Sequence, residues 1–278
     1  MTRDIPGDLW KRLTSTVGLV VTGHDGTTNV MSAEWSYFVN KQPLYAAVAL
    51  GPRTASRRRL EAAGEFSLTL CAEDQAALAD FAGSFSVTDV DKTSSDLVRL
   101  GTPEVTATPW VTGGVLAVEC RLRRTVPLPA HTLYVGEVVA AHLPDDPARP
   151  LVKHGGMHTL GAPAPRTAVV AAAQLRPDGT LRVAATGPAT ETAPMWQVTL
   201  QPPDGPPIPL GMHAPSSHGD LLTDIPLPPE TDRSLLPAHH VLVARGRATR
   251  GRAAVSVEAS PAGHHRTPDE ATLPGAAR

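Results

Sequence analysis

The chain has 278 residues, a formal charge of −2 at pH 7 and a sequence pI near 6.6. That length suits two domains, each able to bury a core of its own. The near-neutral charge gives no overall attraction to nucleic acid or to an anionic membrane, and aromatic residues make up only 4% of the chain, too few for base-stacking surfaces. No run of about 18 apolar residues predicts a membrane span. The charged, polar N-terminus has no signal-peptide core. We therefore expect a cytoplasmic protein that binds neither nucleic acid nor membrane.

The first half of the chain alternates many short strands with few helices. A short helix is predicted over 5–14, and further helices over 54–63 and 73–83. Strands are predicted, in chain order, over 16–23, 28–36, 42–50, 65–71, 114–126 and 131–143, with another near 104–109. A polar loop is expected from Ser84 to Ser95. This pattern favours a mainly β fold, a closed barrel with short helices at its ends and no exposed strand edges.

One hairpin in this half suggests a ligand site. Asp25-Gly26 separates two apolar segments and predicts a tight turn. The second strand then carries small residues, which let a flat ligand approach the backbone, and a single Trp; it includes Asn29, Met31, Ser32, Ala33, Glu34 and Trp35. A strand of this composition is typical of flavin-binding proteins.

The second half of the chain has a different pattern of predicted elements. Gly161–Pro165 reads as a linker. Six strands with clear turn signals follow, at 167–175, 180–186, 195–201, 208–213, 239–246 and 253–259. We expect domain boundaries at 1–161 for the barrel and 166–260 for a small antiparallel β-sandwich of six or seven strands. The polar, Pro- and Gly-rich segment 261–278 is expected to be disordered.

The strongest phosphate candidate is the segment Arg53-Thr54-Ala55-Ser56. Hydroxyl groups at the start of a helix, with the positive end of the helix dipole behind them, suit an anion, and an arginine adds charge-assisted hydrogen bonds. The three arginines of 57–59 cannot all reach one phosphate, because they spread around the helix. The alternative is an ordinary capped surface helix with solvated arginines.

Other polar candidates have structural alternatives. Lys92 in the polar loop is either a ligand contact or a solvated side chain, and His131, of the side-chain type best suited to acid–base chemistry, is either catalytic or structural. His154 and His158 have metal-ligand spacing for a helix, but two intervening glycines argue against a helix and no third ligand lies nearby. We expect no metal site. Cys71 and Cys120 lie far apart in apolar strands, which predicts buried thiols in a reducing compartment.

Taken together, these segments resemble the flavin reductase-like family of FMN-binding split barrels, which includes flavoredoxins and the reductase components of two-component monooxygenases. The resemblance covers about residues 10–161 and rests on the order of many weak motifs: Leu19–Thr22, Asn29–Ala33, Trp35, Pro43–Leu50, Arg53-Thr54, Glu65-Phe66, Asp91-Lys92, Glu119-Cys120, His131–Val138 and Leu160-Gly161. It implies an FMN-dependent oxidoreductase, with FAD as the other flavin, that transfers hydride from NAD(P)H to the flavin. The composition, rich in Ala, Arg, Pro and Gly with little Lys, separately suggests a bacterial source.

The resemblance also implies a homodimer with the cofactor near the subunit interface and a possible monooxygenase partner. It assigns roles to particular positions. Residues along Asn29–Trp35 would face the isoalloxazine, with Arg53, Thr54 and Ser56 on the phosphate, Lys92 near the cofactor and His131 near the nicotinamide.

Three departures from the family pattern leave alternatives open. Glu34 stands where a small or neutral residue is usual, Thr69 stands in place of an Asn, and the domain ends as Met157–Gly161 without the common Tyr. One alternative is a divergent split-barrel enzyme of secondary metabolism that acts directly on a small organic substrate, with Glu34 and His158 facing it. The other is a non-enzymatic cofactor-binding module.

Overall fold

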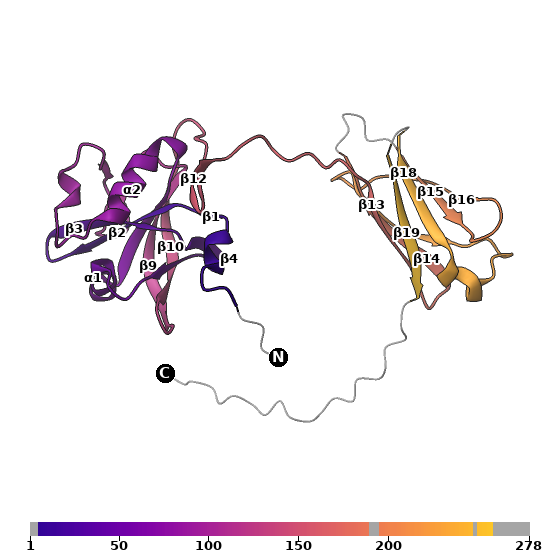
Figure 1. Ribbon diagram of the computed structural model, residues 1–278, viewed down its shortest axis with the longest axis horizontal. Helices are drawn as coiled ribbons and strands as arrows, with labels where there is room; N and C mark the ends of the chain where they lie inside the picture. Colours follow the sequence, from indigo (N-terminus) through magenta and orange to yellow (C-terminus); the bar gives the residue numbers. More distant parts are fainter. Residues whose placement is uncertain (1–4, 189–194, 247–248, 258–278) are drawn as a thin grey trace, which may run out of the picture. The chain divides into compact units, whose positions relative to one another are not determined.

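A computed structural model describes residues 5–188, 195–246 and 249–257. The chain divides into two compact units, Met1–Ala162 and Pro163–Arg278, each treated by itself below. Figure 1 shows both units with their element labels. The predicted disordered segment 261–278 lies outside the described residues.

The first unit is built mostly of short strands. Its strands are β1 (Ser15–Thr16), β2 (Gly18–His24), β3 (Thr27–Ala33), β4 (Ser36–Lys41), β5 (Leu44–Leu50), β6 (Glu65–Leu70), β7 (Leu100–Gly101), β8 (Trp110–Val111), β9 (Leu116–Pro127), β10 (Thr132–His142), β11 (Leu151–His154) and β12 (Gly156–Thr159). Its helices are the 3₁₀ turns η1 (Leu9–Arg12), η2 (Glu73–Gln75) and η3 (Lys92–Ser94) and the α-helices α1 (Ala55–Ala63) and α2 (Ala76–Ser84).

The main sheet of this unit curls into a barrel. Among the described residues its strand order is β3-β2-β6-β9-β10-β5-β4, with neighbouring strands antiparallel. The two outer strands, β3 and β4, are joined by only Glu34 and Trp35. So short a connection brings the two ends of the sheet together, and the Ala49 N–H donates to the Trp35 carbonyl at 2.9 Å. The predicted split barrel is confirmed.

The barrel strands are apolar on both faces because each face has its own core. On β2, Val20 packs inside the barrel with residues such as Phe66 and Tyr134. Its neighbours Leu19 and Val21 face outward and pack under α2 and the loops beside it. A strand buried on both faces reads as a continuous apolar run rather than an alternating one, which is the pattern of this segment.

Turn chemistry fixes the predicted hairpin and the end of the first α-helix. Asp25 and Gly26 both have positive φ, at 49° and 70°, the combination that a two-residue hairpin turn requires. Helix α1 begins after Thr54 in extended conformation and ends at Gly64, whose φ of 68° is the left-handed C-cap.

Several element predictions were wrong in their details. The predicted helix 5–14 is only the 3₁₀ turn η1, and the strand predicted to run to 36 stops at 33 where the barrel closes. Residues 104–109 are not a strand, because their backbone donates to the carboxylates of Glu65 and Glu119 instead of to a neighbouring strand. Strand β4 and the β11–β12 hairpin were not predicted.

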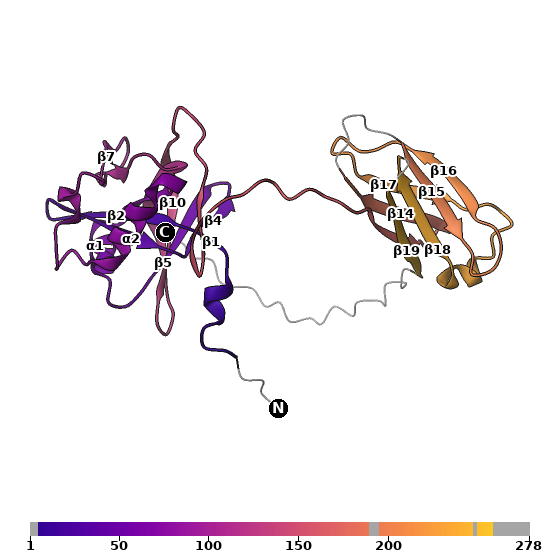
Figure 2. The same ribbon diagram turned by 45° about the horizontal axis from the view of Figure 1, so that its top comes forward.

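The second unit contains β13 (Val170–Leu175), β14 (Thr180–Thr186), β15 (Trp196–Gln201), β16 (Ile208–His213), β17 (Leu221–Pro226), the 3₁₀ helix η4 (Arg233–Ala238), β18 (His240–Arg245) and β19 (Thr249–Val257). The described strands follow the order β16-β15-β18-β19-β13-β14-β17. The first half of β19 pairs with β18 and its end pairs with β13, so this strand links the two layers (Figure 2). Trp196, Leu181 and Leu200 are fully buried between them. The predicted sandwich is confirmed, except that β13 and β19 pair in parallel.

Candidate active site

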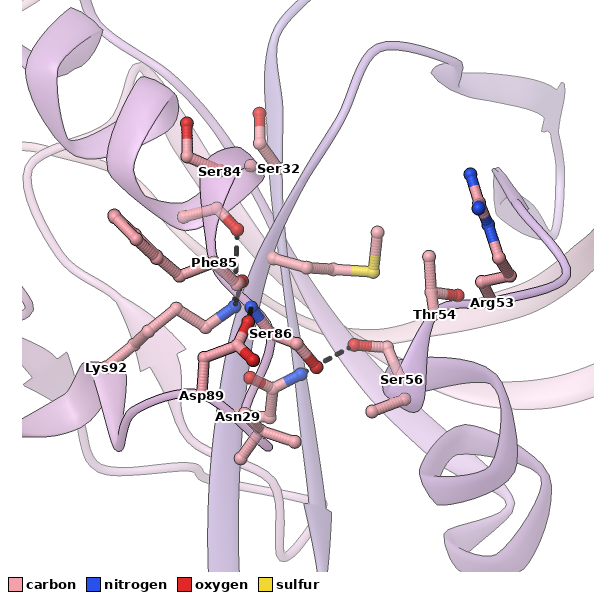
Figure 3. A pocket seen from close by; sticks show the side chains of 15 residues that line it. Asn29, Ser32, Arg53, Thr54, Ser56, Ser84, Phe85, Ser86, Asp89 and Lys92 are labelled. Carbon is pink, nitrogen blue, oxygen red and sulfur yellow. Dashed lines mark hydrogen bonds between the residues drawn. The ribbon is translucent and has the colours of Figure 1, made fainter.

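A cavity of about 650 Å³ lies between β3, the start of α1 and the segment that follows α2. Figure 3 shows its labelled side chains. The cavity brings together most of the residues predicted to bind a cofactor: Asn29, Met31, Ser32, Arg53, Thr54, Ser56 and Lys92. These residues come from segments more than sixty positions apart in the chain, and a volume of this size is typical of small-molecule sites.

The start of α1 forms one end of the cavity. Arg53, Thr54, Ala55 and Ser56 all line it. The first N–H groups of an α-helix have no partner inside the helix, and they carry the positive end of its dipole. The side chain of Thr54 donates to the Gly51 carbonyl at 3.0 Å rather than capping the helix, so these N–H groups remain available to an anion.

Ser56 and Asn29 connect this helix to β3. The Asn29 side-chain Nδ2 donates to the Ser56 hydroxyl oxygen at 2.8 Å, and both residues are buried (Figure 3). Since the Ser56 oxygen accepts this bond, its own hydrogen is left to donate. The Asn29 Oδ1 atom is buried with no hydrogen-bond partner within the described residues. A buried acceptor without a donor is costly, and it marks a place where a ligand N–H would fit.

The side chain of Lys92 supports the opposite wall of the cavity. It is almost fully buried, and its Nζ donates to the carbonyls of Ala82 at 3.2 Å and Phe85 at 2.9 Å (Figure 3). These carbonyls lie at the end of α2, where a cation is favoured. Burial lowers the pKa of Lys92, and the nearby charge of Asp89 opposes that effect. Lys92 therefore caps a helix as well as lining the cavity.

The wall that Lys92 holds was not predicted in detail. It consists of residues from the end of α2 and the loop after it: Ala82, Gly83, Ser84, Phe85, Ser86, Val87 and Asp89. The sequence marks this stretch only as a polar loop following a glycine. Which of its side chains meet β3 depends on how the loop folds back over the sheet, and periodicity does not reveal this.

The three arginines of α1 spread around the helix, as predicted, so they cannot all reach one ligand. None of them lines the cavity. Arg57 donates to the Tyr134 hydroxyl at 3.2 Å, and Arg59 donates to the Thr27 hydroxyl at 2.7 Å. Arg58 is exposed. Arg53, just before the helix, is the arginine of this segment that reaches the cavity.

The other residues predicted for the site, Ala33, Trp35, His131 and His158, do not line this cavity. Ala33 is buried in the barrel core, and the Trp35 ring packs on the rings of Trp10 and His131, with centroid distances of 6.2 and 4.9 Å. His158 lies on β12, where its Nε2 is 3.1 Å from the His154 carbonyl oxygen.

Glu34 lines a second, smaller cavity of about 300 Å³. This cavity shares Ser32, Gly83 and Ser84 with the larger one.

A flavin mononucleotide fits the donor and acceptor groups of the larger cavity. Its phosphate needs N–H, hydroxyl and guanidinium donors, which the start of α1 and Arg53 supply. Its ring system offers an N–H that the unpaired Asn29 Oδ1 could accept.

In the part of the chain that the structure describes, no group of three or more His, Cys, Asp or Glu side chains could hold a metal ion, and none of the helices could cross a membrane.

The first unit is similar to a known protein family. The model of the Flavin reductase like domain matches residues 10–161. An uncharacterized protein of Pyrococcus abyssi is 27% identical over 126 residues, which cover 44% of this chain and 70% of that protein.

Solved structures show the same fold. A flavoredoxin from Methanosarcina acetivorans has a TM-score of 0.52 at 23% identity, covering 59% of this chain and 94% of its own. The NADH:FAD oxidoreductase SgcE6 of Streptomyces globisporus has a TM-score of 0.52 at 20% identity, covering 58% and 99%. An FMN-binding protein from Thermus thermophilus, solved with p-hydroxybenzaldehyde, has a TM-score of 0.52 at 22% identity, covering 59% and 97%. The family model spans more than half of the chain, and this protein therefore belongs to the flavin reductase-like family.

Proposed function

We propose that the first unit binds FMN in the larger cavity and transfers hydride from NAD(P)H to it. The observation that carries this proposal is the convergence of the open N-terminus of α1, Arg53 and the unpaired acceptor of Asn29 on one cavity. Family membership supports the same chemistry. A bound flavin supplies the hydride-accepting centre, so the protein has to bind, orient and shield rather than provide an acid or base. FAD is the alternative flavin.

Each group of the cavity has a task in this proposal. The N–H groups of α1, the free hydrogen of Ser56 and the guanidinium of Arg53 bind the phosphate. Asn29 orients the ring system through its amide oxygen, and Lys92 positions the wall by holding the end of α2.

We further propose that the enzyme is a homodimer. Exposed apolar side chains on the first unit, including Trp10, Phe38 and Val39, support an interface. The ring cluster of Trp10, Trp35 and His131 lies outside the cavity of its own chain. A second copy could bring such a cluster to the cofactor. Light scattering on the purified protein tests this part, and a monomer at micromolar concentration would contradict it.

A reducing, cytoplasmic location and a monooxygenase partner that receives reduced flavin complete the proposal. The location is supported by Cys71 and Cys120, which are both free and buried. The partner is supported by family membership alone.

The deciding experiment is an FMN titration of the wild-type protein and three variants. Arg53→Ala and Ser56→Ala should each weaken FMN binding, because each removes a donor to the phosphate and losing a charge-assisted hydrogen bond costs about 1.5–3 kcal/mol. Arg58→Ala is the matched control, since Arg58 lies in the same segment but outside the cavity. Unchanged affinity in both test variants, or an equal loss in the control, would remove the phosphate site from the proposal.

Turnover separates the proposed reductase from the other functions. The proposed enzyme oxidises NADH or NADPH when FMN is the sole acceptor. A protein that binds FMN and oxidises neither nucleotide is a cofactor-binding module instead. An enzyme acting directly on an organic substrate is favoured by one observation, the charged second cavity that opens beside the first and contains Glu34.

A further inference from the structure

The second cavity is bounded by four parts of the first unit. Its walls come from the segment between β1 and β2, the end of β3, one face of α2 and the β11–β12 hairpin; the lining residues are Val17, Ser32, Glu34, Ala79, Asp80, Gly83, Ser84, Lys153 and Met157. The α2 residues among them are spaced by one, three and four positions, which places them on one side of the helix. Lys153 and Met157 are directly paired across the hairpin, so their side chains lie on one face.

Two half-buried charges of opposite sign face this cavity. Glu34 and Lys153 both line it and are both half-buried. Within the described residues, neither side chain makes a hydrogen bond or ion pair. Removing a charge from water without a partner is unfavourable, so charges left in this state suit a ligand that brings their partners. Asp80 is exposed and adds a second negative charge at the rim.

The rest of the lining is apolar or small. Val17 and Ala79 are buried, and Met157 packs against the same core. A ligand here therefore meets an apolar surface, the charges of Glu34 and Lys153 and, at the rim, the charge of Asp80. A volume of about 300 Å³ holds a small molecule and is too small for a dinucleotide.

The partition between the two cavities is thin. Ser32, Gly83 and Ser84 line both of them. A Cβ atom added at Gly83 would lie 3.3 Å from the Ser32 Cβ, which is tighter than ordinary contact. The absence of a side chain at Gly83 allows the helix to lie close to β3.

We propose that the second cavity is a binding subsite for a small zwitterionic compound with an apolar body, held beside the flavin cavity. Glu34 binds its ammonium group and Lys153 binds its carboxylate, while Val17, Ala79 and Met157 contact the apolar part. The inference rests on the proposed function only for its position next to a flavin, since binding itself requires just the residues of this cavity.

Calorimetric titration with three related compounds tests the subsite. The probes are L-phenylalanine, phenethylamine, which lacks the carboxylate, and 3-phenylpropionate, which lacks the ammonium group. The zwitterion should bind at least tenfold more tightly than either truncated probe, because each truncation removes one charge-assisted pair.

Two variants assign the charges. In Glu34→Gln the zwitterion should lose its advantage over 3-phenylpropionate, and in Lys153→Met it should lose its advantage over phenethylamine. Glu230→Gln and Lys41→Met are matched controls at exposed positions outside the cavity. Both controls should bind all three probes as the wild type does.

The outcomes separate this inference from the proposed function. Failure of all three probes to bind, equal affinities for them, or unchanged discrimination in Glu34→Gln and Lys153→Met would overturn the subsite. FMN affinity is measured on the same samples and should be unchanged in both variants, because neither residue lines the larger cavity. Zwitterion binding without FMN binding would uphold the subsite and refute the proposed flavin site.

Discussion

Replacing Glu119 by glutamine should destabilise the first unit more than any other single carboxylate change we consider. The Glu119 side chain is fully buried in the barrel wall. Its carboxylate accepts the backbone N–H groups of residues 104–106 at 2.6–3.0 Å, together with the Thr106 hydroxyl at 2.9 Å. The Nε2 of His142 lies 2.9 Å from it. Glutamine offers one oxygen and turns two N–H donors toward groups that are themselves donors.

The magnitude follows from the pKa of this group. Burial alone would raise the pKa of Glu119, but the hydrogen bonds from residues 104–106 and His142 outweigh burial and lower it from 4.5 to about 2. By linkage, a lowering of this size corresponds to about 3 kcal/mol of stability at neutral pH. Because the folded-state pKa lies below the unfolded value, this contribution is complete above about pH 5. It declines as the pH falls through 4.5 and vanishes near pH 2.

The assay is urea unfolding, monitored by hydrogen exchange and mass spectrometry. This method measures the exchange of peptides from each unit separately. Glu119→Gln should lower the unfolding free energy of the first unit by about 3 kcal/mol at pH 7 and expose the amides of 104–106. Glu104→Gln is the control. The Glu104 side chain is largely exposed, and its 3.8 Å contact with His142 Nδ1 is long for an ion pair. It should change stability by less than about 0.5 kcal/mol. Equal effects of the two variants, or a difference from wild type that does not shrink between pH 5 and pH 3, would refute the reasoning.

Three further predictions concern other parts of the first unit. Lys92→Met should lower the unfolding free energy by about 1–3 kcal/mol, since two carbonyls at the end of α2 lose their donor, and it should also weaken FMN binding. Urea unfolding measures the first effect and FMN titration the second. An unchanged unfolding free energy together with an unchanged FMN affinity would contradict this prediction. Cys71 and Cys120 should not react with an aromatic disulfide reagent at pH 8 until the protein is denatured, because burial raises the pKa of each thiol to about 12; rapid native labelling would contradict this. Gly64→Ala should cost about 1 kcal/mol of unfolding free energy, because Gly64 has a φ of 68°; an unchanged urea midpoint would contradict it.

The sequence predicts best where one local signal decides the structure. The turn at Asp25-Gly26 and the left-handed cap at Gly64 each depend on a residue type that tolerates positive φ. The helix after Thr54 starts and stops where its signals indicate. These features were predicted because their physical causes lie within a few positions of each other.

Prediction fails where a distant segment decides the structure. Residues 104–109 carry strand-like composition, yet their backbone donates to the carboxylates of Glu65 and Glu119. No sequence signal near 104–109 indicates that these carboxylates will accept its hydrogen bonds. Strand β17, at Leu221–Pro226, was also missed; it pairs with β14.

The candidate site divides in the same way. The end of the cavity proposed to bind phosphate was predicted to lie at Arg53–Ser56 because a helix start carries its own anion signal, and these residues do line the cavity. The Lys92 side was predicted as a ligand contact through resemblance. The structure adds that Lys92 is bound to the carbonyls of α2, a role that requires knowing which helix ends nearby.

The position of Glu34 follows from how the barrel closes. Two residues join β3 to β4 at a bend of the backbone. Trp35 packs on Trp10 and His131, whereas Glu34 lines the second cavity. The bond from the Ala49 N–H to the Trp35 carbonyl and the bond from the Ser36 hydroxyl to the Ala33 carbonyl hold this connection without the Glu34 side chain. A substitution at Glu34 can therefore change the charge of the second cavity without altering the closure of the barrel, which is why this carboxylate is suited to determine specificity.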